Sequence, residues 1–195
     1  MNKLILYHYT SHIGMNGILH SGAIFKGSLL VDTCTVRNEF AVSLTSDESP
    51  IGHGLPDGRE ISKQCAERLD YYINRNDKYF CLDHTQFRLE IHIRKDDEDL
   101  IYLPDFLGGQ SEVLDVLEAT GYHPMLSGQA NTGKTLFDTL SSIKAGHLAG
   151  KAKTWWIYKN RIPINLIQEV RVNHPSGCFL FGSIQQLIQA SMTSK

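Results

Sequence analysis

The sequence predicts an α+β fold, in which strands and helices follow one another without a strict β-α-β rhythm. Several segments alternate apolar and polar residues, as strands with one buried face do, and others repeat apolar residues at helical spacing. No internal repeat, low-complexity segment or linker interrupts the 195 residues. We therefore expect a single domain over residues 1–195, with central antiparallel or mixed sheets and peripheral helices.

The composition is that of a globular protein with an apolar core. Apolar residues make up 42% of the chain and charged residues 21%, and the formal net charge of −2 excludes attachment to nucleic acid by bulk charge alone. No apolar run approaches the roughly 20 residues of a membrane span, and the N-terminus has no signal-peptide pattern, so we expect a cytoplasmic protein without a membrane partner. No CxxC pair predicts a metal site, and we expect reduced thiols at the scattered cysteines, Cys34, Cys65, Cys81 and Cys178.

The beginning of the chain predicts a strand, a helix and a second strand. Residues 4–9 have strand character, Thr10 and Ser11 are good helix N-caps, and Gly22 is the residue type expected just after a helix end. Residues 39–47, EFAVSLTSD, alternate cleanly and predict a strand whose apolar side chains share one face.

The middle of the chain contains the clearest strand pattern. Residues 86–95, QFRLEIHIRK, alternate apolar and polar side chains throughout. A charged turn then leads to a short strand at residues 100–103, LIYL. Residues 60–74 instead predict a helix, because their apolar residues fall on one helical stripe: Ile61, Cys65, Leu69, Tyr72 and Ile73.

The last part of the chain predicts helices and strands in succession. Two helices are expected near residues 111–120 and 134–146. TWWIY (residues 154–158) and LIQEVRV (residues 166–172) predict strands, and SIQQLIQA (residues 183–190) predicts a closing helix.

Residues 128–135, GQANTGKT, match the phosphate-loop pattern G-x-x-x-x-G-K-[ST]. A functional phosphate loop follows a buried apolar strand, but TGYHPMLS precedes this segment, and its Pro124 argues against a central strand. No later apolar run ends in the Asp that would hold magnesium. We therefore interpret the segment as a polar loop that caps the helix after it.

A resemblance to a known family begins at the first strand. LYHYTS (residues 6–11) and GILHSGAI (residues 17–24) resemble the first strand and following helix of the ADP-ribosyltransferase-like superfamily, which includes diphtheria-toxin-type enzymes and poly(ADP-ribose) polymerases. VRNEFAVSLTS (residues 36–46) looks like the second strand of nucleic-acid-targeting toxins of that superfamily, found in toxin–antitoxin and phage-defence systems. WWIYKNRIPINLIQEVRV (residues 155–172) is similar to the end of the family. The resemblance implies an ADP-ribosyltransferase-like fold.

The resemblance also implies that NAD is the substrate. In the family a His on the first strand meets a ribose of NAD, and the matching residue here is His8, with Thr10 nearby. A second strand with small hydroxyl residues lines the nicotinamide cleft. Ser43 and Thr45 are the matching residues of this chain.

The chemistry of NAD adds further candidates for its binding. The pyrophosphate is negatively charged and favours a helix N-terminus, such as the one opening at Ser11, or an arginine, such as Arg37. The nicotinamide ring prefers an aromatic wall. The candidates for this wall are Tyr9, Tyr71, Tyr72 and Tyr79.

The catalytic residues match the family less completely. In the toxins that this chain resembles, an Arg shortly before the second strand assists catalysis, and Arg37 stands there. Breaking the nicotinamide–ribose bond builds positive charge on the sugar, which favours a facing carboxylate. The family's Glu before the Ile-Pro turn is missing from AKTWWIY, residues 152–158. Glu112 and Glu169 are the nearest carboxylates upstream and downstream, and the sequence leaves the choice between them open.

Each candidate has an ordinary structural explanation as well. His8 shares a strand face with apolar residues, which is compatible with a hydrogen-bonded core histidine. Ser43 and Thr45 are compatible with the less buried side of a strand, and Arg37 and Glu169 with solvated surface positions. The order of the candidates along the chain, which follows the family's order, favours the functional interpretation.

The resulting hypothesis is an NAD-dependent ADP-ribosyltransferase that transfers ADP-ribose to a macromolecule. The resemblance favours RNA or DNA over protein as the acceptor, and a toxin or phage-defence effector that a partner antitoxin neutralises. One alternative keeps the fold and NAD, as an RNA 2′-phosphotransferase. Others are a non-catalytic, antitoxin-like binding protein and a nucleotide-binding phosphate-loop protein.

Overall fold

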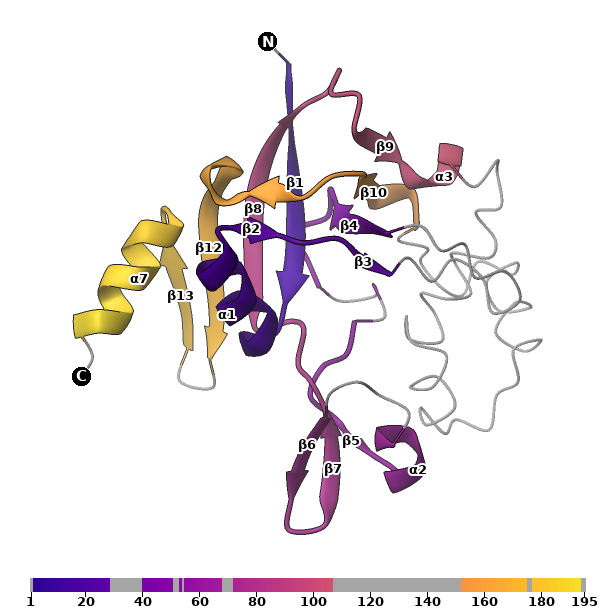
Figure 1. Cartoon of the computed structure of the whole chain (residues 1–195), viewed down its shortest axis with the longest axis vertical. Helices are drawn as coiled ribbons and strands as arrows, with labels where there is room; N and C mark the ends of the chain where they lie inside the picture. The colour runs from indigo at the N-terminus through magenta and orange to yellow at the C-terminus, as the bar shows by residue number, and fades with distance from the viewer. Residues whose placement is uncertain are drawn as a thin grey trace.

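The protein, seen in a computed structural model, is built mainly from antiparallel sheet with few helices (Figure 1). The structure describes residues 2–28, 40–50, 53, 55–67, 72–106, 152–174 and 177–193. The largest sheet has eight strands in the order β13-β12-β8-β1-β4-β10-β9, with β3 paired to β4 beside this path. These strands are β1 (Lys3–Thr10), β3 (Gly27–Ser28), β4 (Phe40–Thr45), β8 (Phe87–Arg94), β9 (Leu100–Tyr102), β10 (Trp155–Tyr158), β12 (Ile167–His174) and β13 (Gly177–Phe181).

Two smaller sheets and short helices complete the described part of the chain. One sheet pairs β2 (Ala23–Ile24) with β11 (Ile162–Pro163), and the other joins β5 (Glu60–Ile61), β7 (Lys78–Cys81) and β6 (Tyr72–Arg75). The helices are α1 (His12–Ser21), α2 (Lys63–Ala66), α3 (Leu103–Phe106) and α7 (Ile184–Thr193), with 3-10 turns η1 (Ala152–Thr154) and η2 (Ile164–Leu166). Among the residues described, no helix combines the length and the apolar content that crossing a bilayer requires.

One face of the large sheet carries the hydrophobic core. Alternate residues of β1, β8, β12, β4 and β10 point to this face, and α1 and α7 pack against it, with α7 beside β12 and β13 in Figure 1. Apolar burial of this kind is the main stabilising contribution to such a fold. The buried members of the cluster are Leu6, Met15, Ile18, Ile24, Val42, Leu44, Leu89, Ile91, Ile93, Tyr158, Ile162, Ile167, Val170 and Ile184.

The opposite face of the same strands is polar. Tyr7 of β1 lies opposite Glu90 of β8, and Glu90 lies opposite Glu169 of β12. Arg88 and Arg171 form the next pair of this face. Because side chains alternate along a strand, these residues leave the sheet on the side away from Leu89 and the core.

Helix α1 begins and ends as its sequence predicts. Ser11 is the N-cap, and its side chain accepts a hydrogen bond from the backbone N–H of Gly14. Gly22 ends the helix in the left-handed conformation, with φ of 71°, and its N–H donates to the carbonyl of Ile18. The Ser11 cap therefore fixes the position at which α1 begins after β1.

The predicted helix over residues 60–74 is wrong. The structure instead has β5 and the four-residue helix α2 in this range, followed by β6 from Tyr72 onward. β6 pairs with β7 through a turn at Asn76 and Asp77, whose φ values of 51° and 61° are those of a tight hairpin. Pairing of β6 and β5 with β7, which follows β6 directly, overrides the helical spacing of the apolar residues.

The predicted strands in the described part of the chain, and the closing helix, are present in the structure. The predicted strands correspond to β1, β4, β8, β9, β10 and β12, and the closing helix corresponds to α7. Several predicted segments lie outside the described residues. They are the helices near 111–120 and 134–146 and the GQANTGKT segment at 128–135.

Candidate functional site

The large sheet opens between β1 and β4. Their register joins a single pair among the described residues, Tyr7 with Thr45, whereas β1 stays paired with β8 from Lys3 to Thr10. Beyond Tyr7, the end of β1 and the beginning of β4 face one another without ladder pairing. Figure 1 shows β4 and β10 running across the direction of β1 and β8. The backbones of β1 and β4 thus separate after Tyr7, and His8 is the first residue of β1 beyond this point.

The His8 imidazole is anchored across this opening. Its Nδ1 lies 3.0 Å from the backbone carbonyl oxygen of Ser43. A carbonyl only accepts hydrogen bonds, so Nδ1 carries the proton and donates. In the neutral ring, Nε2 is then an acceptor, and within the described chain it makes no hydrogen bond.

The surroundings of His8 favour the neutral ring. Burial lowers the pKa of His8, the hydrogen bond to the Ser43 carbonyl acts in the opposite direction, and nearby His84 lowers the pKa further. Burial also lowers the pKa of His84. At neutral pH the Nε2 atom of His8 therefore offers a lone pair and no charge.

The neighbouring hydroxyls of β1 are used inside the protein. Ser11 caps α1, where its Oγ lies 3.3 Å from the nitrogen of Gly14. The Oγ1 of Thr10 lies where a side chain on Gly14 would begin, only 2.0 Å from an added Cβ. Thr10 and Ser11 are both buried. Their positions indicate that they shape the β1–α1 turn next to His8.

The two hydroxyl residues of β4, Ser43 and Thr45, differ in whether their side chains are exposed. Thr45 is buried, and its Oγ1 lies 2.8 Å from the Oγ1 of Thr154 and accepts from the N–H of Asp47 at 3.0 Å. Ser43 is exposed, and its carbonyl receives the His8 hydrogen bond. Thr45 thus ties β4 to η1, whereas Ser43 contributes to the opening through its backbone carbonyl.

Tyr9 faces the other side of the sheet. Its hydroxyl donates to the backbone carbonyl of Glu48, and burial raises the pKa of Tyr9, so the phenol stays protonated. A pocket of about 480 Å³ lies beside it. The pocket is lined by Tyr9, Asp47, Glu48, Ser49, Pro50, Arg88, Arg171 and Asn173.

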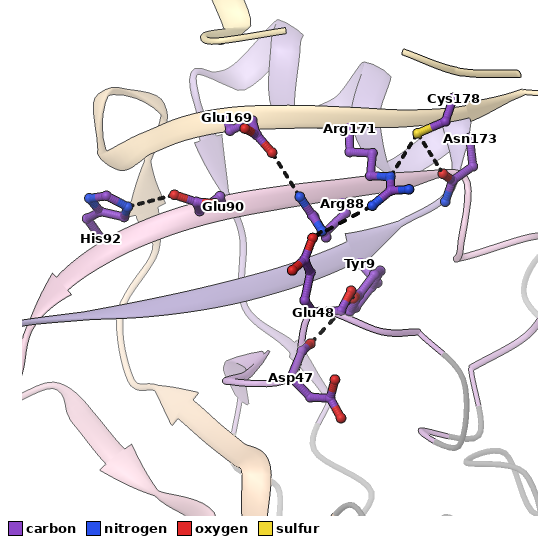
Figure 2. A network of polar contacts seen from close by, with 10 residues as sticks. All are labelled: Tyr9, Asp47, Glu48, Arg88, Glu90, His92, Glu169, Arg171, Asn173 and Cys178. Carbon is purple, nitrogen blue, oxygen red and sulfur yellow. Dashed lines mark hydrogen bonds and ion pairs between the residues drawn. The ribbon is translucent and has the colours of Figure 1, made fainter. Parts of the chain in front are cut away.

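Arg88 is the buried charge at this pocket, and its side chain is 5% exposed. It donates to the carboxylate of Glu48 and, at 2.8 Å, to that of Glu169, as Figure 2 shows. Its guanidinium also lies 4.9 Å from the ring centre of Tyr7, a cation–π distance. Burial opposes the charged form of Arg88, but the two carboxylates outweigh this effect, so its pKa is raised.

The structure does not bring Glu169 to His8. His8 lies opposite Leu89 on the core face, whereas Glu169 lies opposite Glu90 on the polar face and pairs with Arg88. The two side chains therefore leave the sheet on opposite sides. The other catalytic candidates, Arg37 and Glu112, lie outside the described residues.

The aromatic candidates are also separated. Tyr72 and Tyr79 contact one another on the small β6–β7 hairpin, with ring centres 5.6 Å apart. The sequence did not single out His53, which is buried between the rings of Tyr9 and Trp155 and accepts a hydrogen bond from the Trp155 indole N–H at 2.7 Å. No local pattern marks His53, because its partners are distant in sequence.

Within the described ranges, no group of three or more His, Cys, Asp or Glu side chains is placed to hold a metal ion. Comparisons with protein-family models, with curated proteins and with solved structures find no match to this chain.

Proposed function

We propose that the protein is an NAD-dependent ADP-ribosyltransferase of the ADP-ribosyltransferase-like superfamily, with NAD in the opening between β1 and β4. The observation that supports this most directly is the anchored His8. It stands at the point where β1 and β4 separate, with Nδ1 committed to Ser43 and with no hydrogen bond at Nε2 from the residues that the structure describes. The resemblance pairs this histidine with a ribose of NAD, and the adjacent strand is the hydroxyl-bearing one that it expects.

The proposed contact is a ribose hydroxyl that donates to Nε2 of His8. A neutral acceptor suits this role, because a protonated ring would offer only donors. The exposed side chain of Ser43 alternates with the buried Val42 and Leu44, so it lies on the polar face, and Ser43 contributes to the opening through its backbone carbonyl. Thr10, Ser11 and Thr45 support the site indirectly, by fixing the turn into α1 and the course of β4.

The reaction breaks the bond between nicotinamide and ribose C1′, and the bonding electron pair leaves with nicotinamide. The acceptor nucleophile forms the new bond to C1′ and gives up a proton. Positive charge develops on the ribose as the bond breaks, so a facing carboxylate lowers the barrier. We assign Arg37 to this step from the resemblance and Glu112 as the nearest upstream carboxylate of the chain, since Glu169 lies on the opposite face and is paired with Arg88.

We propose RNA or DNA as the acceptor from the same resemblance, with an antitoxin as the neutralising partner. The polar sheet face adds little to this part of the proposal. Arg88 is paired with Glu48 and Glu169, and His92 with Glu90 at 2.7 Å. Both side chains are already paired with carboxylates and offer little attraction to a phosphate backbone.

The test incubates the purified protein with NAD labelled in the adenylate phosphate, together with single-stranded DNA, RNA or cell protein in turn. His8→Asn is the informative variant, because an Asn amide retains a donor for the Ser43 carbonyl and removes the acceptor at Nε2. His20→Asn, on the exposed last turn of α1, is the matched control. We expect wild type and His20→Asn to transfer label to nucleic acid, and His8→Asn to lose at least tenfold in rate at an unchanged melting temperature.

Each other outcome assigns a different function. Label on protein alone refutes the nucleic-acid acceptor but retains the reaction. Loss of an RNA 2′-phosphate with NAD consumption identifies the phosphotransferase alternative. An absence of any NAD binding or turnover by the wild-type protein overturns the proposal and leaves a non-catalytic binding protein.

A further inference from the structure

The pocket on the polar face has no place in the proposed reaction, because it lies on the opposite side of the sheet from His8. At its floor, a single carboxylate oxygen of Glu48 lies between two arginines. The oxygen accepts from Nη1 of Arg88 and is 3.7 Å from Nη1 of Arg171 (Figure 2). Two guanidinium groups converging on one oxygen are a common arrangement for binding an external anion.

Arg88 and Arg171 differ in how many of their N–H groups already donate hydrogen bonds. Arg88 is 5% exposed and bonds both Glu48 and Glu169. Arg171 is 39% exposed, and its Nε lies 2.8 Å from the Sγ of Cys178. In the described part of the chain, the terminal nitrogens of Arg171 donate no hydrogen bond. Within the described residues, the terminal nitrogens of Arg171 are therefore held to Glu48 only by the 3.7 Å ion pair at Nη1.

Glu48 is the displaceable member of the group. Its side chain is 60% exposed, although it contacts a guanidinium that is nearly buried. Its backbone is held separately, because the hydroxyl of Tyr9 donates to its carbonyl. The carboxylate can therefore rotate into solvent while the loop that carries it stays in place.

Charge balance limits what can replace the Glu48 carboxylate. In the paired network, Arg88 and Arg171 contribute two positive charges and Glu48 and Glu169 two negative charges, and Asp47 adds a further acidic group to the pocket lining. A ligand with one negative charge restores this balance when Glu48 moves out, whereas a dianion leaves an excess negative charge beside Glu169. The planar guanidinium groups match a planar carboxylate, which is also the group that they hold in this structure.

We propose that this pocket is a binding site for a small organic monocarboxylate, which takes the place of the Glu48 side chain between Arg88 and Arg171. The pocket volume of about 480 Å³ exceeds that of a carboxylate group and accommodates a body of the size of an aromatic ring. Glu48 acts as an internal competitor for the site. This inference is independent of the proposed reaction with NAD.

The test is a calorimetric titration with benzoate, a planar monoanion, and with dimethyl phosphate, a tetrahedral monoanion of the same charge. Glu48→Gln removes the competitor, and we expect the Kd for benzoate to fall about tenfold, which corresponds to about 1.4 kcal/mol. Glu60→Gln, an exposed carboxylate on β5 that pairs with Lys78, is the control for overall charge and is expected to leave Kd unchanged. Arg171→Gln is expected to abolish binding, whereas Arg161→Gln, at another exposed arginine, retains it.

The direction of the Glu48→Gln effect distinguishes this proposal from a purely structural role of the network. If Glu48 only stabilises the loop, its replacement weakens binding or leaves it unchanged, and the proposal is overturned. Tighter binding of dimethyl phosphate than of benzoate overturns the assignment to carboxylates. An absence of benzoate binding to both the wild type and Glu48→Gln, each folded at the temperature of the titration, refutes the site.

Discussion

The contact between Thr10 and Gly14 gives a direct test of the turn beside the proposed site. A Cβ added at Gly14 would lie 2.0 Å from Oγ1 of Thr10, whereas one added at Gly17, in the next turn of the same helix, meets nothing within 4 Å. Alanine stabilises a helix interior relative to glycine by about 1 kcal/mol. The two substitutions therefore have the same intrinsic benefit and differ only in the contact.

The expected effects have opposite signs. Gly17→Ala gains about 1 kcal/mol and raises the melting temperature by about 3 °C for a protein of this size. At Gly14 the shortfall from ordinary contact is more than 1 Å, and Thr10 is buried, so the clash costs about 2–3 kcal/mol. The net effect of Gly14→Ala is a loss of about 1–2 kcal/mol, or about 4 °C.

Differential scanning calorimetry of both variants measures these shifts, and a double variant identifies their cause. Thr10→Ala removes Oγ1, and the Cβ of residue 10 then lies 3.4 Å from the new methyl group, close to ordinary contact. We expect Gly14→Ala to cost far less in a Thr10→Ala background, by at least 1 kcal/mol in the double-mutant cycle. If Gly14→Ala stabilises the protein as Gly17→Ala does, the close packing of the β1–α1 turn is refuted.

Two further predictions concern charge and pH. Glu48→Gln and Glu169→Gln are each expected to lower the free energy of unfolding, measured in urea, by about 1 kcal/mol. The double variant is expected to lower it by about 3–5 kcal/mol, because it leaves the buried Arg88 unpaired. Additive effects of the two substitutions would contradict this. Because the pKa values of His8 and His84 lie below the ordinary value of 6.5, the unfolded chain takes up protons first on acidification. Stability is therefore expected to fall as the pH drops below about 6.5, less steeply in His8→Asn; an unchanged slope would contradict the assignment.

The elements of the described chain that the sequence could predict are those with a strong local pattern. β8 alternates through its whole length, and α1 has both a Ser cap and a glycine end. The hairpin of β6 and β7 could not be predicted in the same way, because the apolar residues of 60–74 repeat at helical spacing. The deciding signal was the Asn76–Asp77 pair, which adopts the left-handed conformation that a tight hairpin turn needs.

The polar face shows why its contacts could not be predicted. The alternation of β8 correctly separated Arg88 from the apolar residues of the strand. Its partners, however, are 40 residues before it, at Glu48, and 81 residues after it, at Glu169. A strand pattern states which residues share a face, but it contains no information on which strand becomes the neighbour.

His8 indicates more about function than the residues of the polar face do, because it is a polar residue on a face that is otherwise mostly apolar. Glu90 and His92 are polar residues on a polar face and pair with one another at 2.7 Å, so their presence requires no ligand. His8 instead interrupts an apolar face, between Leu6 and Thr10, at the one position where β1 loses its pairing with β4. A polar group on a buried face is the less expected observation. Because its Nδ1 is fixed by Ser43 while Nε2 makes no hydrogen bond to the residues that the structure describes, we interpret the residue as a binding group, and the Asn variant that keeps the first contact and removes the Nε2 acceptor tests this interpretation.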